Sequence, residues 1–312
     1  MLDRYRQILQ KEIEPYYLQS KRTSTCEGLS KMSTDQLWAE IDDYRRGDEI
    51  PPLKLKLELV ERMVRECDFC EHGCKVNREK GEKGYCEVTE SKISSEFLHM
   101  GEEKELVPSH TVFFAGCNFA CAFCQNYEIS QLNRGRHVPV DTMAKKLDSS
   151  GGKNVNWVGG DPTPNLPYIL RVLEGMSNPL PQIWNSNLYL SEKSMKILSQ
   201  LMDVYLTDFK YGNDECAKKL SDVDDYTFVL RRNHLIAEKT GDLIIRHLAL
   251  PGHLECCTKP LLEWIENNLD DPKINIMTQY RPVWHADRHP QIDRYLNSDE
   301  KKEIERLRDR YS

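Results

Sequence analysis

The chain has 312 residues, enough for one large domain or two modest ones. Its 43 Lys and Arg residues against 50 Asp and Glu residues give a net charge of −7, so no overall positive charge attracts the protein to nucleic acid or acidic lipid. A mean hydropathy of −0.64 and the lack of an apolar run of about 18 residues argue against a membrane-spanning helix. The first residues, MLDRYRQILQ, lack the apolar segment of a signal peptide, and we therefore expect a cytoplasmic protein.

Eleven cysteines are the most informative feature of the composition. Cytoplasmic thiols are kept reduced, so this number indicates metal or redox chemistry more than disulfides. Seven of them form two groups, one at Cys67, Cys70, Cys74 and Cys86 and the other at Cys117, Cys121 and Cys124. The remaining four have no ligand spacing, and we interpret them as ordinary thiols: Cys26, Cys216, Cys256 and Cys257.

The first part of the chain is predicted to be helical. Residues 1–52 form a helical extension with a helix over 34–46, which Ser33 or Thr34 would cap. A further helix over 53–66 leads into the first cysteine group, and we assign residues 53–106 to a small four-cysteine metal-binding module. Residues 107–290 form the core, and residues 291–312 a C-terminal helix.

The core alternates short β-branched or aromatic runs with amphipathic segments, which is typical of βα units and a parallel sheet. We expect strands over 111–116, 154–159, 182–187, 204–208, 242–250 and 273–280. Helices are expected over 142–149, 166–175, 191–202, 214–239 with a break, and 258–269. Six such units form either a doubly wound sheet or an incomplete barrel, and periodicity does not distinguish the two. Polar residues follow the carboxyl ends of the strands, where parallel βα proteins build active sites.

The second cysteine group places three thiols within eight residues, directly after the first expected strand of the core. Iron–sulfur clusters are usually held by four cysteines, so three would leave one iron open to another ligand. Structural zinc completed by a distant histidine, or buried free thiols, are the alternatives.

This CxxxCxxC sequence, continued as FCQN, resembles the radical S-adenosylmethionine (SAM) enzymes. The resemblance implies a partial (β/α)6 TIM-like barrel and a 4Fe-4S cluster on Cys117, Cys121 and Cys124. It also implies that SAM chelates the fourth iron and is cleaved by one electron to a 5′-deoxyadenosyl radical, which abstracts a hydrogen atom from the substrate.

Later segments extend the resemblance to activases of glycyl-radical enzymes, and in particular to pyruvate formate-lyase-activating-enzyme-like proteins. Gly159-Gly160-Asp161-Pro162 is similar to the family's Gly-Gly-Glu-Pro element, with Asp in place of Glu. Asp203 to Lys210 is similar to the activases' fourth strand, and Asn185-Ser186-Asn187 stands where they carry Asp-Thr-Asn-Gly, without the acid. The residues that would contact SAM by this match are Gly159, Gly160, Asp161, Asn185, Asn187, Asp208, Lys210 and Arg246. Ordinary turns, an exposed ion pair and a packing role for Arg246 are the alternatives.

The first cysteine group suits either structural zinc or a second iron–sulfur cluster. Its CxxCxxxC spacing, followed by VNR and GxxGxC, is also similar to the activase-like proteins, so that the resemblance covers the chain from about Glu66 to about Ala286.

The expected function is therefore a radical SAM oxidoreductase that acts on a glycine of a glycyl-radical protein. The alternatives are a radical SAM enzyme for a small metabolite or another macromolecule, and a non-catalytic iron–sulfur electron-transfer adaptor. We expect a low-potential reductant such as flavodoxin or ferredoxin as a partner, together with a protein substrate, and no nucleic acid or membrane.

Overall fold

The computed structural model of the chain describes residues 2–24, 28–47, 49–270 and 272–311. Cys26, expected to be an ordinary thiol, lies outside this part. No helix within these residues is long and apolar enough to cross a membrane.

The centre of the fold is a single sheet whose seven strands lie side by side in the order in which they occur along the chain. Its strands are β1 (Ile93–His99), β2 (Ser109–Phe114), β3 (Val155–Gly159), β4 (Gln182–Ser186), β5 (Val204–Asp208), β6 (Asp242–Leu248) and β7 (Lys273–Met277). Strands β2 to β7 are parallel and correspond to the six predicted strands, whereas β1 pairs with β2 in the antiparallel direction. A doubly wound sheet would reverse its strand order at the middle. The uninterrupted order therefore identifies the incomplete barrel.

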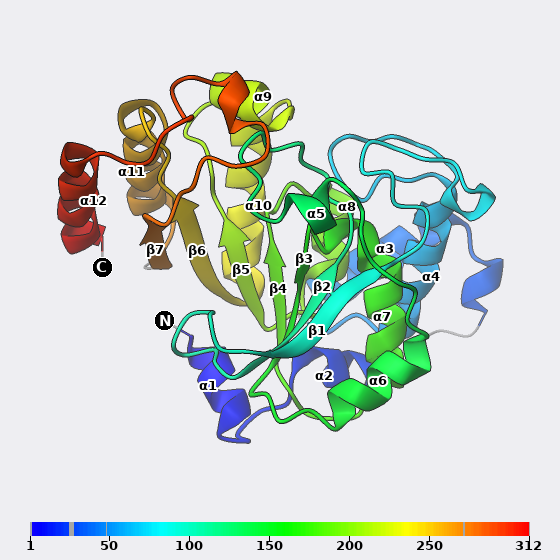
Figure 1. The fold of residues 1–312 in the computed structure, drawn as a ribbon. Coiled ribbons are helices and arrows are strands. Elements are labelled where there is room, and N and C mark those ends of the chain that lie inside the picture. The colour runs from blue at the N-terminus through cyan, green and yellow to red at the C-terminus, as the bar shows by residue number, and fades with distance from the viewer. Residues whose placement is uncertain (1, 25–27, 48, 271, 312) are drawn as a thin grey trace.

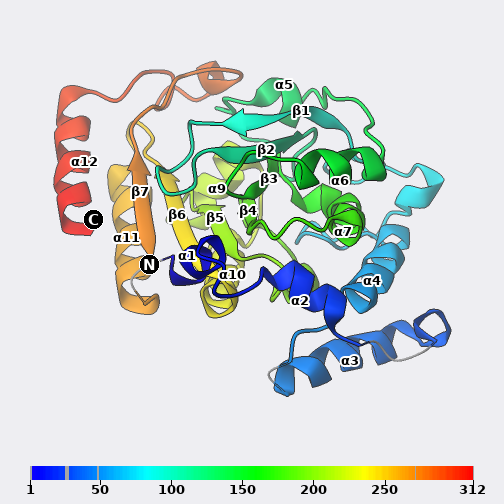
Figure 2. The same ribbon diagram turned by 90° about the horizontal axis from the view of Figure 1, so that it is seen from below.

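Helices cover the outer side of this sheet. Seen from below, the strands follow an arc, and α7, α10 and α11 lie outside it (Figure 2). The helices of the core are α5 (Tyr127–Ser130), α6 (Val140–Asp148), α7 (Leu166–Gly175), α8 (Glu192–Leu198), α9 (Asp214–Ser221), α10 (Tyr226–Thr240) and α11 (Lys259–Asn268). The expected break in the helix predicted for 214–239 falls between α9 and α10, where Asp222 and Asp225 have positive φ angles. The last helix, α12 (Ser298–Tyr311), lies beside α11 and β7 (Figure 1).

The N-terminal residues form α1 (Asp3–Leu9), α2 (Tyr16–Arg22), α3 (Thr34–Arg46) and α4 (Leu53–Arg65). Ser33 and Gln36 form a capping box at the start of α3, which confirms the predicted start of that helix. Helices α1 and α2 lie at the opposite end of the sheet from α5 and α9 (Figure 1). Arg4 Nε donates to Asp203 Oδ1 at 2.9 Å, and the Tyr5 amide donates to Asp242 Oδ2 at 2.7 Å. Polar groups at the starts of β5 and β6 thus hold the N-terminal helices against the barrel.

Strand β1 and helix α5 were not predicted. The sequence ISSEFLH has little alternation of apolar and polar residues, because β1 is an edge strand with exposed side chains, Phe97 and Leu98 among them. Helix α5 has only four residues, too few for a helical period to show in the sequence.

Candidate active site

A cavity of about 250 Å³ opens at the carboxyl ends of the parallel strands. Each strand contributes residues just where it ends, so segments that lie far apart in the sequence meet at one face. The cavity wall contains every predicted residue of the second cysteine group and of the cofactor site: Cys117, Cys121, Cys124, Gly159, Gly160, Asp161, Asn185, Asn187, Asp208, Lys210 and Arg246.

The three cysteines lie on the loop that follows β2. Gly116 starts this loop with a φ of +86°, and a Cβ there would come within 2.3 Å of Val88 Cγ2, so the turn requires glycine. Three hydrogen bonds reach the sulfur atoms: the Phe119 amide donates to Cys117 Sγ at 3.4 Å, Asn187 Nδ2 donates to the same sulfur at 3.9 Å, and Ser221 Oγ donates to Cys121 Sγ at 2.9 Å. Such bonds stabilise a thiolate and adjust the potential of an iron–sulfur cluster bound to it.

Burial raises the pKa of the Cys117 thiol well above its ordinary value. Burial also raises the pKa of Cys121 to about 11, although the nearby ammonium of Lys210 opposes this. Both thiols therefore keep their protons at neutral pH until a metal displaces them.

The two glycines at the end of β3, Gly159 and Gly160, are required by the backbone around them. A Cβ on Gly159 would lie 2.2 Å from the Phe114 nitrogen, and one on Gly160 would lie 2.1 Å from the Gly116 oxygen. The Gly160 amide donates to the Phe114 carbonyl at 2.9 Å. The end of β3 can therefore pack directly against the end of β2 and the start of the cysteine loop.

Asp161 is buried and already fully engaged by protein groups. Its carboxylate accepts hydrogen bonds from the Thr163 amide at 2.9 Å, from Ser186 Oγ at 3.0 Å and from the Asn187 amide at 2.9 Å. Asn187 Nδ2 in turn donates to Asn118 Oδ1 at 2.7 Å, beside Cys117. Asp161 thus joins the loops after β3 and β4 and positions Asn187.

The charged side of the cavity is an ion-pair network on β5 and β6. Asp208 accepts from Lys210 Nζ at 2.7 Å and from Arg246 Nε at 3.1 Å, and Arg246 also donates to Asn185 Oδ1. Arg246 Nη1 also lies 3.3 Å from Glu102 Oε2. Burial alone would raise the pKa of Asp208, but the two cations outweigh it and lower this pKa to about 2. Asp208 is consequently ionised throughout the physiological pH range.

The comparison with protein families identifies the chain. Residues 111–265, from β2 to α11, match the family described as the radical SAM superfamily, and the match contains all the cavity residues just described. The chain is also 47% identical over 281 residues to "Uncharacterized protein MJ0674" of Methanocaldococcus jannaschii, an alignment that covers 86% of this chain and 82% of the relative. The chain belongs to the radical SAM superfamily.

Solved structures of SuiB from Streptococcus suis are also similar to this chain, at a lower sequence identity than the relative from Methanocaldococcus jannaschii. One crystal structure of SuiB has a TM-score of 0.45 at 15% identity, and the match covers 64% of this chain. A structure of SuiB bound to S-adenosylmethionine also has a TM-score of 0.45, at 14% identity and with 62% of this chain covered. This chain spans 44% of the length of either SuiB chain.

Radical SAM proteins use a 4Fe-4S cluster and SAM, and the cavity of this radical SAM chain fits both. Its three thiols can ligate three irons, while its amides, its cations and the carboxylate of Asp208 can bind an amino acid and a ribose. Gln125 Oε1 is buried in the wall, and within the described residues it has no hydrogen-bond partner. A buried acceptor of this kind is normally paired, and a polar ligand in the cavity would supply the missing donor.

Sequence reasoning missed several cavity residues of this radical SAM domain. The walls also contain Phe119, Phe123, Gln125, Asn126, Ser130, Gln131, Val158, Ser186, Leu248 and Met277. Four of them, Phe123, Gln125, Val158 and Ser186, directly follow or precede predicted residues along the chain, so for these four the proximity to the motifs was the available signal.

The first cysteine group lies next to the cysteine loop of the radical SAM domain. Cys67, Cys70, Cys74 and Cys86 line one small pocket, and Gly84 packs so closely on Cys74 that a Cβ would come within 2.9 Å of its sulfur. The module contacts the second group through His72, whose Nε2 lies 2.8 Å from the Asn118 carbonyl oxygen and whose ring stacks on Tyr85.

Proposed function

We propose that this chain is a radical SAM oxidoreductase with its 4Fe-4S cluster on Cys117, Cys121 and Cys124. The convergence of these thiols with the predicted SAM-binding residues in one cavity is the observation that carries the proposal. When bound, the cluster supplies one electron that cleaves SAM, and the resulting 5′-deoxyadenosyl radical abstracts a hydrogen atom from the substrate.

In this proposal, the residues of the chain bind SAM and orient it. Lys210 and Arg246 offer cationic donors to the carboxylate or ribose hydroxyls of SAM, while Asp208 keeps both in place. Asn185 and Asn187 offer amide donors and acceptors from the end of β4. The buried aromatic side chains Phe119 and Phe123 limit the access of water, which protects a radical from side reactions.

For the substrate we propose a glycine of a glycyl-radical protein. The support is the sequence resemblance to the activase-like proteins between about Glu66 and Ala286, which includes the four-cysteine module. A candidate glycyl-radical protein with deuterium at its glycine α-carbons tests this proposal. Transfer of deuterium into 5′-deoxyadenosine supports it, and transfer only from a metabolite or from another residue type would contradict it.

We further propose that Cys67, Cys70, Cys74 and Cys86 hold a second metal group, either zinc or an iron–sulfur cluster. Its contact with the cysteine loop through His72 suits both a structural support and an electron relay. Iron and zinc analysis of the anaerobically reconstituted protein distinguishes them. About eight irons indicate a second 4Fe-4S cluster, whereas about four irons together with zinc that is lost in Cys70→Ser indicate structural zinc in this module.

The decisive experiment is reductive cleavage of SAM. The protein is reconstituted anaerobically and reduced with dithionite or with flavodoxin or ferredoxin, and 5′-deoxyadenosine is then quantified with and without substrate. We expect cleavage by the wild type and its loss in Cys121→Ala, whereas Cys26→Ala, which removes a cysteine outside both groups, should retain it. A cluster-loaded wild type that neither binds nor cleaves SAM, with substrate present, would instead support an electron-transfer adaptor.

A further inference from the structure

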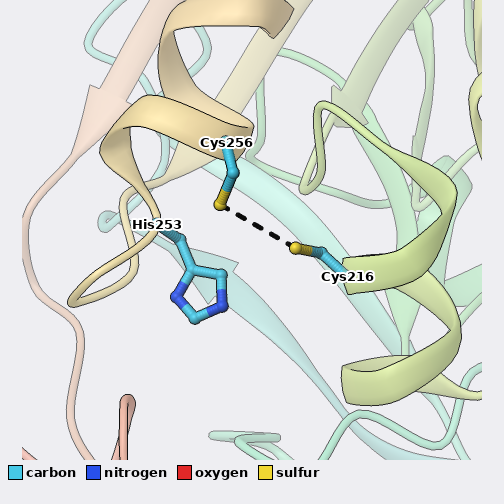
Figure 3. A group of neighbouring side chains, drawn as sticks. All are labelled: Cys216, His253 and Cys256. Carbon is cyan, nitrogen blue, oxygen red and sulfur yellow. Dashed lines mark hydrogen bonds between the residues drawn. The ribbon is translucent and has the colours of Figure 1, made fainter.

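Cys216, His253 and Cys256 form a cluster of soft donor atoms outside the radical SAM cavity. Their donor atoms all lie within 4.8 Å of one another, although His253 and Cys256 are far from Cys216 in the sequence. Cys216 lies in the first turn of α9, and Cys256 lies in the π-helical segment Leu254–Thr258 that leads into α11. Figure 3 shows the two sulfur atoms directed toward each other, with the imidazole beside them.

The distance between the two sulfurs fits one shared metal ion. Cys216 Sγ and Cys256 Sγ are 3.9 Å apart. Two thiolates bound to tetrahedral zinc at about 2.3 Å each lie about 3.8 Å apart, whereas a disulfide requires about 2.05 Å. The thiols therefore already have the spacing of two ligands of a single ion.

His253 has the hydrogen bond that is typical of a metal-binding histidine. Its imidazole is buried, and Nδ1 lies 2.8 Å from the Pro251 carbonyl oxygen. A carbonyl can only accept, so Nδ1 carries the hydrogen and Nε2 of the neutral ring keeps its lone pair. Ligating histidines almost always donate their other N–H to such a group, which fixes the tautomer and the ring orientation.

Contacts of Asn213 and Gly212 hold Cys216 and Cys256 close to each other. Asn213 caps α9 by accepting from the Cys216 amide at 2.8 Å, and its Nδ2 donates to the Cys256 carbonyl at 2.8 Å. The preceding Gly212 packs so closely that a Cβ would lie 2.6 Å from the Cys257 oxygen. The loops after β5 and β6 are thus joined by their backbones at the point where the donors meet.

We propose that Cys216, His253 and Cys256 bind one thiophilic divalent ion of the zinc class. Two thiolates and one imidazole are a known zinc ligand set that leaves a fourth position open, and the exposure of Cys256 lets water or a small ligand take it. Cys257 is buried and does not belong to the three-donor group, although its sulfur lies 3.9 Å from that of Cys256. The site is separate from the radical SAM cavity and does not depend on the proposed function.

Helix α9 connects the proposed metal site with the cysteine loop of the radical SAM domain. Cys216 lies near the start of α9, and Ser221 at the end of the same helix donates to Cys121 Sγ. An ion that ties α9 to the loop after β6 would therefore hold in place the helix that contacts a cluster ligand.

The test is zinc content per chain in the full-length, anaerobically reconstituted protein, measured with iron on the same samples. We expect Cys216→Ser and His253→Gln to lose about one zinc per chain relative to the wild type while iron is unchanged, and the matched variant Cys257→Ser to lose none. In the cobalt-substituted protein, the thiolate charge-transfer absorption should be weaker in both ligand variants than in the wild type. Equal zinc content in the wild type and both ligand variants would overturn the proposal.

A second measurement uses the wild type alone, so its result does not depend on whether the variants fold. Zinc should slow the alkylation of both Cys216 and Cys256. Mass spectrometry of the alkylated protein identifies which cysteines are modified. Alkylation that zinc does not slow, or a Cys216–Cys256 disulfide that persists in the anaerobic protein, would refute the metal site.

Discussion

Ser221 Oγ lies 2.9 Å from Cys121 Sγ, and the Tyr211 hydroxyl lies 2.6 Å from Ser221 Oγ. All three side chains are buried, so water cannot replace either contact. With Cys121 as a thiolate, Ser221 must donate to the sulfur, and Tyr211 is then the donor to Ser221. The last residue of α9 thus connects to the sulfur of a proposed cluster ligand.

We predict that Ser221→Ala lowers the midpoint potential of the cluster bound to Cys121. A hydrogen bond to a cluster sulfur favours the more negative, reduced state, so its loss makes reduction harder. A net hydrogen-bond energy of about 1 kcal/mol corresponds to about 40 mV for one electron. Redox titration followed by electron paramagnetic resonance measures the shift.

The matched control for this prediction is Ser199→Ala. Ser199 is also a buried serine at the end of a helix, but its hydroxyl donates to the Met195 carbonyl. Its substitution should leave the potential unchanged. Equal potentials in Ser221→Ala and the wild type would mean that the serine has no influence on the cluster.

A second prediction concerns the ion-pair network of the cavity. Asp208→Asn keeps the shape of the side chain but removes the charge shared by Lys210 and Arg246. We expect the free energy of unfolding to fall by about 2 kcal/mol near pH 7, the usual value of a hydrogen bond to a charged group. Urea unfolding followed by circular dichroism measures this loss, and Asp287→Asn, at an exposed position, should cost little.

The pH dependence checks the cause of that loss. The pKa of Asp208 is lowered to about 2, so its contribution is present above the unfolded value of about 3.9 and is lost as the pH falls through about 2. The wild type and Asp208→Asn should therefore differ equally from pH 6 to 8 and converge below about pH 4. A difference that stays constant down to pH 3 would contradict an ionic origin.

A third prediction concerns the approach of β3 to β2. Gly160→Ala places a methyl group 2.1 Å from the Gly116 oxygen, which belongs to the backbone and cannot rotate away. We expect a loss of about 3 kcal/mol in unfolding free energy and poor binding of SAM, because the cysteine loop must shift. Gly47→Ala is the control, since its nearest contacts lie at 3.6 Å and its φ of −83° suits alanine. Unfolding midpoints like that of the wild type in both variants would show that this packing is dispensable.

The sequence predicted the parallel strands and the site that they build because both depend on local patterns. Trp157 and Tyr205 belong to short apolar runs that become strands buried on both faces, and the polar residues after each run are brought together wherever parallel strands end. Both ends of the helix Leu166–Gly175 were predicted correctly, because its apolar positions repeat with the helical period.

What the sequence could not predict depends on contacts between distant segments. Strand β1 has little alternation of apolar and polar residues and mostly exposed or partly exposed side chains, and it forms because β2 offers it a free edge. Cys216 and Cys256, interpreted as ordinary thiols, approach each other only because Asn213 and Gly212 bring the loops after β5 and β6 into contact. No spacing rule applies to ligands supplied by two separate βα units.

A fourth prediction concerns the attachment of the C-terminal helix. Glu300 accepts from Arg294 at 2.7 and 2.8 Å, from the Asn297 amide at 2.8 Å and from the Gly252 amide at 2.7 Å. The hydrogen bonds from Arg294 are the largest cause that lowers the pKa of Glu300 to about 2, and the two amides add to them against the effect of burial. The carboxylate therefore caps α12 and ties it to the loop after β6.

We expect Glu300→Gln to lower the free energy of unfolding by about 1.5 kcal/mol at pH 7, since several charge-assisted bonds become neutral ones and Arg294 stays partly exposed. The lowered pKa means that this stability is present above the unfolded value of about 4.3 and is lost as the pH falls through about 2. Unfolding at pH 7 and pH 3 should thus show a difference from the wild type that shrinks with acid, whereas the exposed Glu305→Gln should show almost none at either pH. A Glu300→Gln protein as stable as the wild type at pH 7 would mean that α12 is held by its apolar contacts alone, with Ile304 as the buried anchor.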